Sequence, residues 1–511
     1  MALLNDAGFE VTATFTGPIR KSDRVLLHLP QLPCKGAPYV HGNTVANAIF
    51  SVRERVLGRT AAGLWEPTLK PSEGAFQAPS LALFRRRVGR YLPRHSLPIS
   101  VDQFVGSYQG QKRRRYESAA TSLEVKPLGA PDAFPGVFLK SEKWFEEKAA
   151  RVISARSPRY NLCLGRYTQP IEHKIYRAID EVFGAPTIMK GLTPVQRARV
   201  VEEHTQAFDQ FVAVGQDFSK FDQHISEEAL KYEHAFYELC YGDRDLTRLL
   251  AKQLKTTCYA TLLDGKVVYK LRGGRMSGDM NTALGNCVLS AALIWAYAHE
   301  KSIRVRVIVD GDDSVTFMER RDLAKYRDGI AEWMRAKGFI LVSEEPVYEI
   351  TQVEFCQAKY TRLEVPTMVR NPMKAITQDH EWIVDRSIEH ADVLAATGLG
   401  GLSLYGACPV LGAYYNMLSR ASPNSAKTLR RMATYSSWLR AASAEGVYTE
   451  ATEESRYAFW ETWGMEPGEQ RAIEAFFNAQ DLSYLRDCRR SYDHKNVKNT
   501  VYFPSLNQFT L

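Results

Sequence analysis

A short acidic turn between two β-branched runs constrains this chain more than any other stretch. Residues 305–309 (Val-Arg-Val-Ile-Val) and 314–317 (Ser-Val-Thr-Phe) flank the turn Asp-Gly-Asp-Asp at 310–313. β-Branched residues favour strands and a Gly-containing turn joins antiparallel neighbours, so this stretch predicts a β-hairpin. Its tip would carry the carboxylates of Asp312 and Asp313. Because Asp and Gly are ordinary turn formers, an acidic surface turn fits the same residues.

Further carboxylates follow another predicted strand. Residues 211–215 (Phe-Val-Ala-Val-Gly) lead into Asp217, and Asp222 lies five residues further on. An acid at a strand end beside an acidic hairpin tip would make a cage of oxygen ligands, which suits Mg²⁺. Two such ions about 4 Å apart can bind both the attacking and the leaving oxygen of a phosphoryl displacement. We therefore expect Asp217 and Asp312 to bind metal, with Asp313 as a secondary ligand.

A glycine-rich loop at 273–278 opens a helix that we expect to continue to about residue 300. Ser277, Thr282 and Asn286 mark its mouth and first turns. Thr282 and Asn286 are four residues apart and share one helix face. Their hydroxyl and amide groups can hydrogen-bond a sugar without adding charge. A glycine-rich turn with an ordinary helix N-cap is the alternative interpretation.

Two groups of cations have the character expected of a polyanion site. Lys140, followed by an extended segment with Arg151 and Arg156, would project cations toward a triphosphate, to which arginine makes bidentate contacts. Arg113 and Arg114 stand in a basic run that ends beside a tyrosine, so cations that bind an RNA backbone lie next to a base-stacking ring. Taken alone, the first group is better interpreted as a salt-bridged surface, and the second fits a solvated charged face equally well.

Composition excludes several other classes of protein. The chain has 511 residues, 45% hydrophobic content and a net charge of +8, which fits a globular protein with a polyanionic partner but does not demand one. Its eight cysteines form no zinc-type cluster, and its start lacks a signal peptide. The most apolar helical stretch, residues 287–298, is shorter than the roughly 20 residues needed to span a bilayer. We therefore expect any membrane attachment to come from a partner or from a segment outside this sequence.

Other catalytic schemes explain fewer of these residues. The sequence contains neither Gly-x-Ser-x-Gly nor Gly-x4-Gly-Lys-[Ser/Thr], so a hydrolase elbow and a P-loop lack support. A pair of acids of the aspartic protease or glycosidase kind is compatible with the number of carboxylates. Such a pair would leave the basic stretch and the Ser/Thr/Asn helix without a role.

Taken together and in this order, the motifs resemble a known family. Segments 217–222 (Asp-x4-Asp), 277–286 (Ser-Gly-x3-Thr-x3-Asn) and 311–313 (Gly-Asp-Asp) look like motifs A, B and C of viral RNA-dependent RNA polymerases. The joint pattern is highly specific, unlike any one part. Further segments resemble the tombusvirus-like polymerases of positive-strand RNA viruses, namely 38–42, 108–114, 151–161, 170–172 and 190–192. The resemblance spans roughly residues 35–375.

The resemblance implies an α+β fold of the right-hand polymerase type, with fingers, a palm built on an antiparallel sheet, and a helical thumb. Residues 1–208 would form an N-terminal extension and the fingers, including motif F at about 140–161. Residues 209–375 would form the palm with an interleaved fingers segment and motifs A to E. Residues 376–511 would form the helical thumb and a C-terminal tail.

The resemblance also assigns roles to single residues. Asp217, Asp312 and Asp313 would bind two Mg²⁺ ions, for which Mn²⁺ can substitute. Lys337 would be the motif D general acid that protonates the leaving pyrophosphate. The ribose and triphosphate would contact a set of residues from motifs A, B and F, namely Asp222, Ser277, Thr282, Asn286, Lys140, Arg151 and Arg156. RNA would contact residues of two further segments, namely Arg113, Arg114, Phe355 and Cys356.

The expected activity is template-directed synthesis of RNA on RNA, replicating a positive-strand viral genome. Expected partners are the single-stranded RNA template, the nascent RNA, NTPs, a membrane-anchored viral replication protein and host factors, at membrane-associated complexes in the host cytoplasm. Two alternatives stay open. A reverse transcriptase or other DNA-making palm polymerase would need a steric gate against the 2′-hydroxyl, and a non-catalytic RNA-binding scaffold would leave the three acidic sites unexplained.

Overall fold

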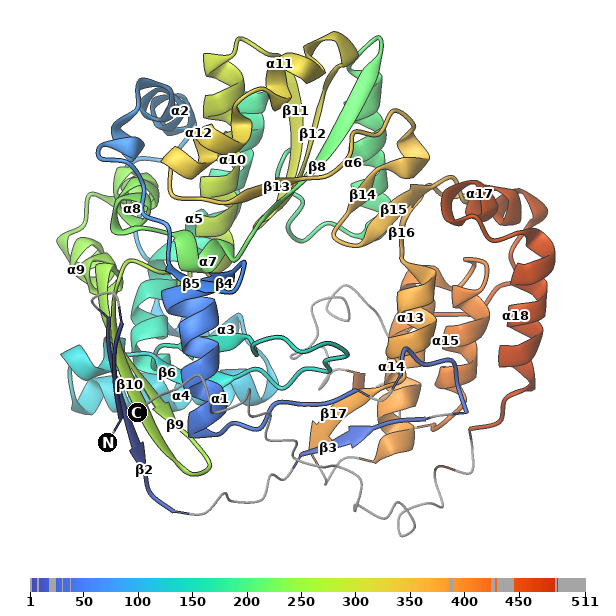
Figure 1. The fold of residues 1–511 in the computed structure, drawn as a ribbon, viewed down its shortest axis with the longest axis horizontal. Helices are drawn as coiled ribbons and strands as arrows, with labels where there is room; N and C mark the ends of the chain where they lie inside the picture. The colour runs from blue at the N-terminus through green and yellow to red at the C-terminus, as the bar shows by residue number, and fades with distance from the viewer. Residues whose placement is uncertain are drawn as a thin grey trace.

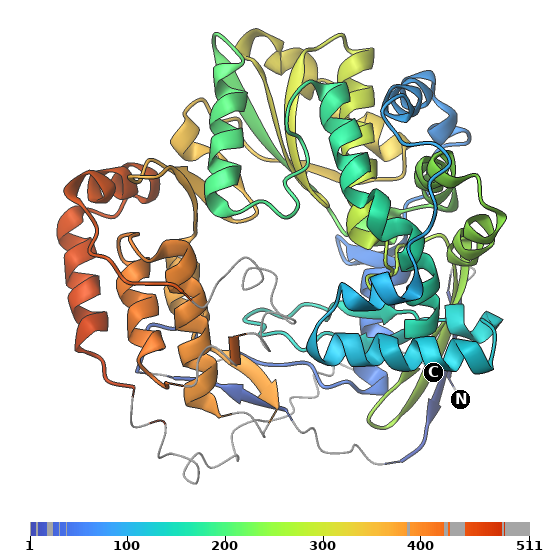
Figure 2. The same ribbon diagram turned by 180° about the vertical axis from the view of Figure 1, so that it is seen from behind.

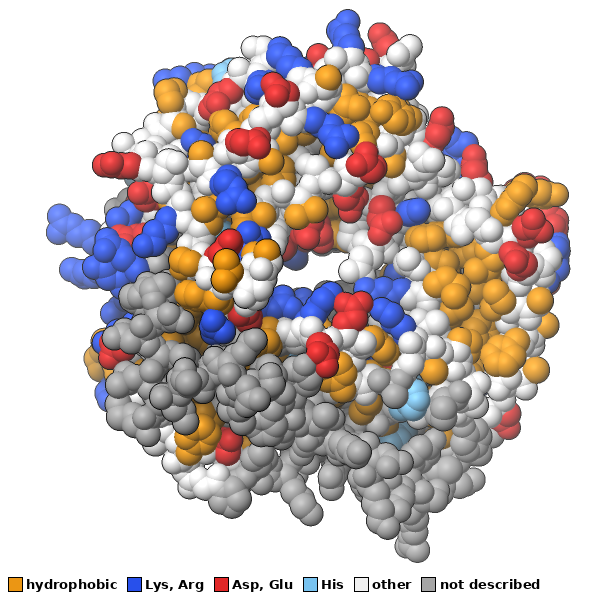
Figure 3. Space-filling view, in the orientation of Figure 1, with side chains coloured by type: hydrophobic (Ala, Val, Ile, Leu, Met, Phe, Trp, Pro, Cys, Tyr) orange, Lys and Arg blue, Asp and Glu red, His pale blue; other side chains and the backbone are white. Residues whose placement is uncertain are grey.

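The elements of the chain form a ring. The computed structural model describes residues 2–482 except 7–8, 18–23, 30, 37, 386–388, 424–427 and 430–444, and also describes Leu485. Figure 1 shows the ring from one side and Figure 2 from behind. Side chains leave an opening through its middle (Figure 3). Acidic side chains gather on one edge of this opening, and mostly basic ones gather on the edge opposite.

A four-stranded antiparallel sheet lies on one side of the ring. Its order is β11 (Val305–Asp310), β12 (Asp313–Glu319), β8 (Phe211–Phe218) and β13 (Leu341–Ser343). The predicted hairpin is β11–β12, in which Asp310 pairs with Asp313. The apolar run at 211–215 is β8, which pairs with β12 on one side and β13 on the other. Both sequence predictions are therefore confirmed.

Both faces of this sheet are covered, which explains why its strands are almost continuously apolar. Val212, Val214 and Val307 pack on one face with α5 (Pro158–Phe183) and α10 (Thr282–Glu300). Ala213 and Ile308 pack on the other face with α6 (Pro194–Gln206). The alternation follows the two-residue period of a strand. Helix α10 is buried along nearly its whole length and ends at residue 300, as expected.

A second, six-stranded sheet joins segments far apart in sequence. Its order is β1 (Ala2–Asp6), β2 (Phe9–Phe15), β10 (Gly265–Arg272), β9 (Lys255–Thr261), β6 (Gly136–Leu139) and β7 (Val152–Ala155). Helix α1 (Val45–Val52) packs against it. The loop between β6 and β7 therefore extends from a sheet that the N-terminal residues help to build.

A small hairpin connects the four-stranded sheet to the helical C-terminal part. Strands β14 (Glu354–Phe355), β15 (Ala358–Thr361) and β16 (Thr367–Arg370) form a three-stranded sheet. The turn between β14 and β15 consists of Cys356 and Gln357, with φ of 51° and 62°. Positive φ at both central residues is the geometry of a type I′ turn, which matches the twist of a tight hairpin.

The described residues after 371 are mostly helical, as predicted for this part of the chain. They form α13 (Pro372–Gln378), α14 (His390–Tyr405), α15 (Leu411–Ser419), α17 (Glu453–Trp463) and α18 (Pro467–Ala479) around a core of their own. Strand β17 (Trp382–Asp385) pairs with β3 (Arg24–Leu27), so an N-terminal segment crosses to this part of the ring. Within the predicted thumb, residues 386–388, 424–427, 430–444, 483–484 and 486–511 lie outside the described residues.

Among the described residues, no helix is both long enough and apolar enough to cross a membrane.

The remaining elements complete the ring. The remaining helices and strands are η1 (Arg53–Leu57), β4 (Gly58–Ala61), β5 (Leu64–Pro67), η2 (Ala75–Gln77), α2 (Pro79–Gly89), α3 (Val101–Gly106), α4 (Gly110–Val125), η3 (Ala130–Ala133), α7 (Phe221–His224), α8 (Glu227–Tyr241), α9 (Arg244–Leu254), η4 (Arg320–Asp322), α11 (Leu323–Arg327), α12 (Ile330–Ala336) and η5 (Ile350–Gln352).

The close crossing of α14 and α15 gives a stability test. A Cβ on Gly398 would lie 2.2 Å from the backbone N of Ser419, and backbone cannot rotate away as a side chain can. We expect Gly398→Ala to lower the free energy of unfolding by about 1–3 kcal/mol, measured as a fall in Tm. Gly468→Ala is the control, because a Cβ there meets nothing within 4 Å. An equal Tm for the two variants would contradict the packing described here.

Candidate active site

Three aspartates from distant segments meet at the end of the four-stranded sheet. The β12–β8 ladder ends with Ser314 opposite Gln216, so the next residues, Asp313 and Asp217, continue side by side. Gly311, at φ 82°, forms the turn that presents Asp312 and Asp313. The turn is fixed to α10, because Ser290 Oγ donates to Gly311 O at 2.7 Å. The structure thus brings together the carboxylates that the sequence predicted would meet.

Burial raises the pKa of each of these groups, and like charge adds to the rise for Asp312 and Asp313. Burial raises the pKa of Asp312 to about 7, with further contributions from Asp313, Asp222 and Asp217. The pKa values of Asp217 and Asp313 are raised mainly by burial, and for Asp313 also by Asp217. Within the described residues, no lysine or arginine forms an ion pair with Asp217, Asp312 or Asp313. The cluster therefore has a charge that a bound cation would offset.

The donor set fits a hard divalent cation. Its oxygen atoms are of the type that Mg²⁺ prefers, and Mg²⁺ usually takes only one or two carboxylates together with waters and substrate phosphates. Among the described residues, no three acidic, His or Cys side chains already form a closed metal cage. A site of this kind leaves coordination positions open for waters and substrate phosphates. Asp217, Asp312 and Asp313 are the residues that would hold such ions.

Asp310 belongs to the same hairpin but has a different role. Lys190 Nζ lies 3.0 Å from Asp310 Oδ1, and Arg197 Nη2 lies 2.5 Å from Asp310 Oδ2. Asp310 therefore anchors the hairpin to α6 and to the loop before it. Nothing in the sequence distinguished Arg197, because one arginine on an amphipathic helix resembles any other.

Glu344 is a further acid near the cluster that sequence reasoning missed. Its pKa is raised mainly by burial and also by Glu354, Asp217 and Asp313. It follows β13, and its backbone N–H donates to Gly215 O at 2.8 Å. A Cβ on Gly215 would lie 2.0 Å from a Glu344 carboxylate oxygen, so the glycine lets this side chain lie across β8. Only the pairing of β13 with β8 reveals the contact.

The predicted ribose-binding pair is also brought together. Asn286, in the second turn of α10, donates through Nδ2 to Asp222 Oδ1 at 2.8 Å. Asp222 lies on α7, directly after the turn that follows β8. The pKa of Asp222 is raised by burial, while the hydrogen bond from Asn286 opposes that rise. Asp222 and Asn286 are thus a coupled unit beside the aspartate cluster.

Ser277 and Thr282 make structural hydrogen bonds within the glycine-rich loop. Ser277 Oγ accepts from the backbone N–H of Ser154 at 3.0 Å, and Thr282 Oγ1 donates to Met276 O at 2.7 Å. A Cβ on Gly278 would lie 2.7 Å from Ala155 Cα, so the loop packs directly on β7. These bonds fix the loop against the strand that ends the β6–β7 hairpin.

The predicted triphosphate cations divide into two exposed residues and one buried residue. Lys140 and Arg151 face each other across the mouth of the β6–β7 loop and both pair with Glu142, at 2.6 Å and 2.7 Å. Their side chains are 43% and 57% exposed. Arg156 is only 1% exposed, and its Nε donates to Asp279 Oδ1 at 2.6 Å. This burial corrects the expectation that Arg156 faces a triphosphate, because its guanidinium already braces the glycine-rich loop.

Lys337 is also placed differently from the prediction. Its Nζ donates to Ala75 O at 2.8 Å and lies over the Trp333 ring. The pKa of Lys337 is lowered by burial, and the acid that opposes this shift is Glu300. Glu300 ends α10, about 21 Å from Asn286 at 1.5 Å per residue. This placement corrects the expectation that Lys337 faces the reacting centre.

The predicted RNA contacts lie in two places. Phe355 is buried beneath Arg197, whereas Cys356 Sγ lies 3.6 Å from Asp313 Oδ2, so the β14–β15 turn reaches the aspartate cluster. Arg113 and Arg114 are exposed on α4, where Arg113 pairs with Glu117 at 2.8 Å. The hairpin thus joins the site, while the α4 cations remain a separate basic surface.

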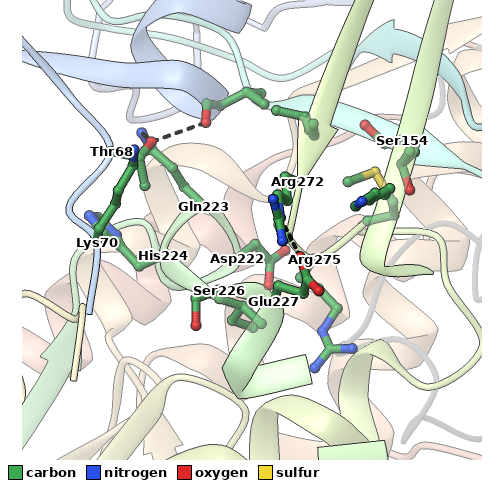
Figure 4. A pocket seen from close by; sticks show the side chains of 18 of the residues that line it. Thr68, Lys70, Ser154, Asp222, Gln223, His224, Ser226, Glu227, Arg272 and Arg275 are labelled. Carbon is green, nitrogen blue, oxygen red and sulfur yellow. Dashed lines mark hydrogen bonds and ion pairs between the residues drawn. The ribbon is translucent and has the colours of Figure 1, made fainter. Parts of the chain in front are cut away.

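A cavity of about 960 Å³ opens beside Asp222. In Figure 4, Thr68 and Lys70 lie along one side and Ser154 on the other, with Asp222 and Arg275 between them. Its basic lining residues are Arg55, Lys70, Lys231, Lys255, Lys270, Arg272 and Arg275. Cations around Asp222 make this cavity suited to a phosphorylated sugar.

Comparison with known proteins identifies the family. The profile of the family described as viral RNA dependent RNA polymerase matches residues 12–484. The chain therefore belongs to this viral polymerase family, with the α+β fold already described.

Three relatives show how far the likeness extends. The RNA-directed RNA polymerase of Oat chlorotic stunt virus is 39% identical over 415 residues, 77% of this chain and 55% of the relative. That of Maize chlorotic mottle virus is 37% identical over 452 residues, 86% of this chain and 46% of the relative. That of Tomato bushy stunt virus is 34% identical over 475 residues, 91% of this chain and 57% of the relative. The chain spans about half the length of these relatives.

The raised pKa of Asp312 predicts a pH dependence of stability in metal-free protein. Because its folded pKa of about 7 lies above that of a free carboxyl, the contribution of protonated Asp312 is complete near pH 4 and is lost as pH rises through 7. Asp312→Asn removes this loss. The metal-free variant should gain on the wild type as pH rises, melting roughly 2 °C further above it at pH 8 than at pH 5.

The same melting curves can test the metal site. Mg²⁺ should raise the Tm of the wild type more than that of Asp312→Asn, because a ligand of the folded state stabilises it. If wild type and variant had the same Tm at pH 8, both with and without Mg²⁺, Asp312 would be neither a buried acid with a raised pKa nor part of a cation site.

Proposed function

We propose that this chain is an RNA-directed RNA polymerase that replicates a positive-strand viral RNA genome by template-directed nucleotidyl transfer. The observation that carries the proposal is the placement of Asp217, Asp312 and Asp313 at one sheet end beside the coupled pair Asp222–Asn286. Metal-binding acids next to a reader of the 2′-hydroxyl suit RNA synthesis. Membership of the viral polymerase family supports the same reaction.

We assign the parts of a right hand to the ring. Residues 209–375 with the four-stranded sheet would be the palm, and their segment β9–β10 would belong to the fingers together with residues 1–208. The helices after residue 375 would be the thumb. The opening in Figure 3, acidic on one edge and mostly basic on the other, would hold template and nascent RNA. The basic edge would contact phosphates and the acidic edge the metal ions.

The carboxylates of the site would bind either the metal ions or the sugar. Asp217, Asp312 and Asp313 would hold two Mg²⁺ ions, or Mn²⁺ in their place. When bound, such ions lower the pKa of an attacking hydroxyl and stabilise charge on the phosphate. Asp222 would accept a hydrogen bond from the ribose 2′-hydroxyl.

The cations nearest the site would handle phosphates and RNA. Lys140 and Arg151 both pair with Glu142. Once released from this carboxylate, the two cations would bind the triphosphate. The NTP would enter through the basic cavity of Figure 4, because Asp222 and the cationic side chains line the same cavity. The β14–β15 turn would support the RNA end beside Asp313, and Arg113 and Arg114 would bind RNA backbone on α4. Arg156 would brace the loop.

The remaining partners follow from the family resemblance. We propose that the polymerase works with a membrane-anchored viral replication protein and host factors, at membrane-associated complexes in the host cytoplasm.

Removal of the metal-binding acids tests the reaction. We expect Asp312→Ala and Asp217→Ala to abolish NTP incorporation on a single-stranded RNA template in Mg²⁺ or Mn²⁺. Circular dichroism should show that both variants keep the fold. Asp245→Ala is the control, since that side chain is 72% exposed. Synthesis at the wild-type rate by folded Asp312→Ala protein would overturn the assignment.

The same assay separates the alternatives. An RNA polymerase should incorporate NTPs in preference to dNTPs, because Asp222 and Asn286 accept the 2′-hydroxyl. A strong preference for dNTPs would instead favour a DNA-making palm polymerase. RNA binding that is independent of Mg²⁺, without synthesis on any template, would favour a scaffold.

The basic cavity makes a kinetic prediction. Lys70→Glu reverses an exposed charge on its lining, so we expect KM for NTP to rise several-fold with kcat little changed, and more so at low salt. Lys325→Glu, an exposed lysine of α11 outside the cavity, is the matched control. Equal KM values for the two variants would exclude this route for the nucleotide.

A further inference from the structure

A buried ion pair lies directly behind the Asp222–Asn286 pair. Arg275, from the glycine-rich loop, forms an ion pair through its guanidinium with Glu233 of α8, and both side chains are 0% exposed. Arg275 Nε also donates to Asn286 Oδ1 at 3.1 Å. An unbroken chain of contacts thus runs from the interior of α8 through Arg275 and Asn286 to Asp222.

This chain fixes which end of the Asn286 amide faces Asp222. With Oδ1 held by Arg275, Nδ2 must point the other way, where it donates to Asp222 Oδ1 at 2.8 Å. A rotated amide would place its carbonyl oxygen against the carboxylate and its NH₂ group against a guanidinium that can only donate. Both contacts would be repulsive. Arg275 therefore determines the polarity of the amide, which a helix position alone does not.

Glu233 in turn accepts hydrogen bonds from two further side chains. Asn281 Nδ2 donates to it at 2.8 Å and Tyr237 OH at 2.5 Å. A Cβ on Gly285 would lie 2.2 Å from Glu233 Oε1 and 2.4 Å from Arg275 Nη2, so only glycine leaves room for the pair against α10. Buried ion pairs are weak sources of stability because both charges lose water. Such a fully enclosed pair is better explained by the geometry that it imposes.

The geometry leaves one Asp222 oxygen for a substrate. Asn286 occupies Oδ1, and among the described residues no side chain or backbone group donates to Oδ2. Arg275 also fixes the backbone of Asp222, because the backbone N–H of Arg275 donates to Asp222 O at 2.9 Å. Asp222 lines the cavity of Figure 4, so this oxygen has a route to a bound ligand.

We propose that the Arg275–Glu233 pair is a positioning element for ribose selection: it orients the Asn286 amide so that Asp222 presents a free oxygen to the 2′-hydroxyl of the incoming nucleotide. The inference rests on the proposed polymerase function. Neither Arg275 nor Glu233 touches the sugar. Their loss should therefore change discrimination between NTP and dNTP while leaving the metal-binding aspartates unaffected.

The test compares kcat/KM for ATP and dATP on an RNA template-primer with the full chain. Arg275→Lys keeps the charge that pairs with Glu233, but one ammonium cannot also reproduce the planar Nε contact to Asn286. We expect the ATP/dATP ratio to fall about tenfold, the lower end of the loss seen when residues that support metal ligands are replaced. The Mg²⁺ concentration for half-maximal activity should not change.

Arg456→Lys is the matched control, because Arg456 forms another buried arginine pair, with Glu474, between α17 and α18. It should show a comparable loss of Tm with an unchanged ATP/dATP ratio. A double-mutant cycle with Asn286→Ala adds a second readout. If Arg275 acts through Asn286, then Arg275→Lys should lower the ratio no further in the Asn286→Ala background.

Glu233→Gln keeps the shape of Glu233 and gives an independent variant should Arg275→Lys fail to fold, with the same expected fall in the ratio. An unchanged ratio in either folded variant, or an equal fall in Arg456→Lys, would overturn the inference. Absence of any incorporation by the wild type would instead overturn the proposed polymerase function, so the two failures are distinguishable.

Discussion

Concentration of like charge at one end of a buried sheet is the constraint on which the rest of this structure depends. Burial raises the pKa values of Asp217, Asp312 and Asp313, and neighbouring carboxylates raise those of Asp312 and Asp313 further. Such an arrangement persists only if strong packing holds the strands in place. Helices on both faces of the sheet supply that packing, and the ion pairs of Asp310 with Lys190 and Arg197 fix the hairpin.

Buried arginine–carboxylate pairs extend this support to the surrounding loop. Arg156–Asp279 ties the glycine-rich loop to the end of β7, and Arg275–Glu233 ties it to α8. Both pairs meet in one segment of the chain, residues 275–279. The glycine-rich part of the site is thus held by charges removed from water, for which the loss of one partner is strongly destabilising. Lys140 and Arg151, by contrast, are exposed and pair with Glu142 at the mouth of the β6–β7 loop.

Much of the site could be predicted because its motifs are local. The hairpin and the acid near the end of β8 follow from strand patterns and turn residues, whereas the pair Asp222–Asn286 follows from the family resemblance. The structure contains the hairpin and brings the pair into contact. Arg156 and Lys337 were misplaced because a basic residue has the same sequence signature whether it is exposed or buried. Only contacts with Asp279 and Ala75 reveal that both point inward.

By itself, the sequence determined the order and the chemistry of the motifs, and with them the family. Periodicity and turn residues act within a few positions, so they can be read along the chain. The tertiary structure decided which charges face the opening and which brace it, as with Glu344 across Gly215 and Glu233 behind Arg275. Those contacts join residues far apart in sequence, and their burial depends on every element packed around them.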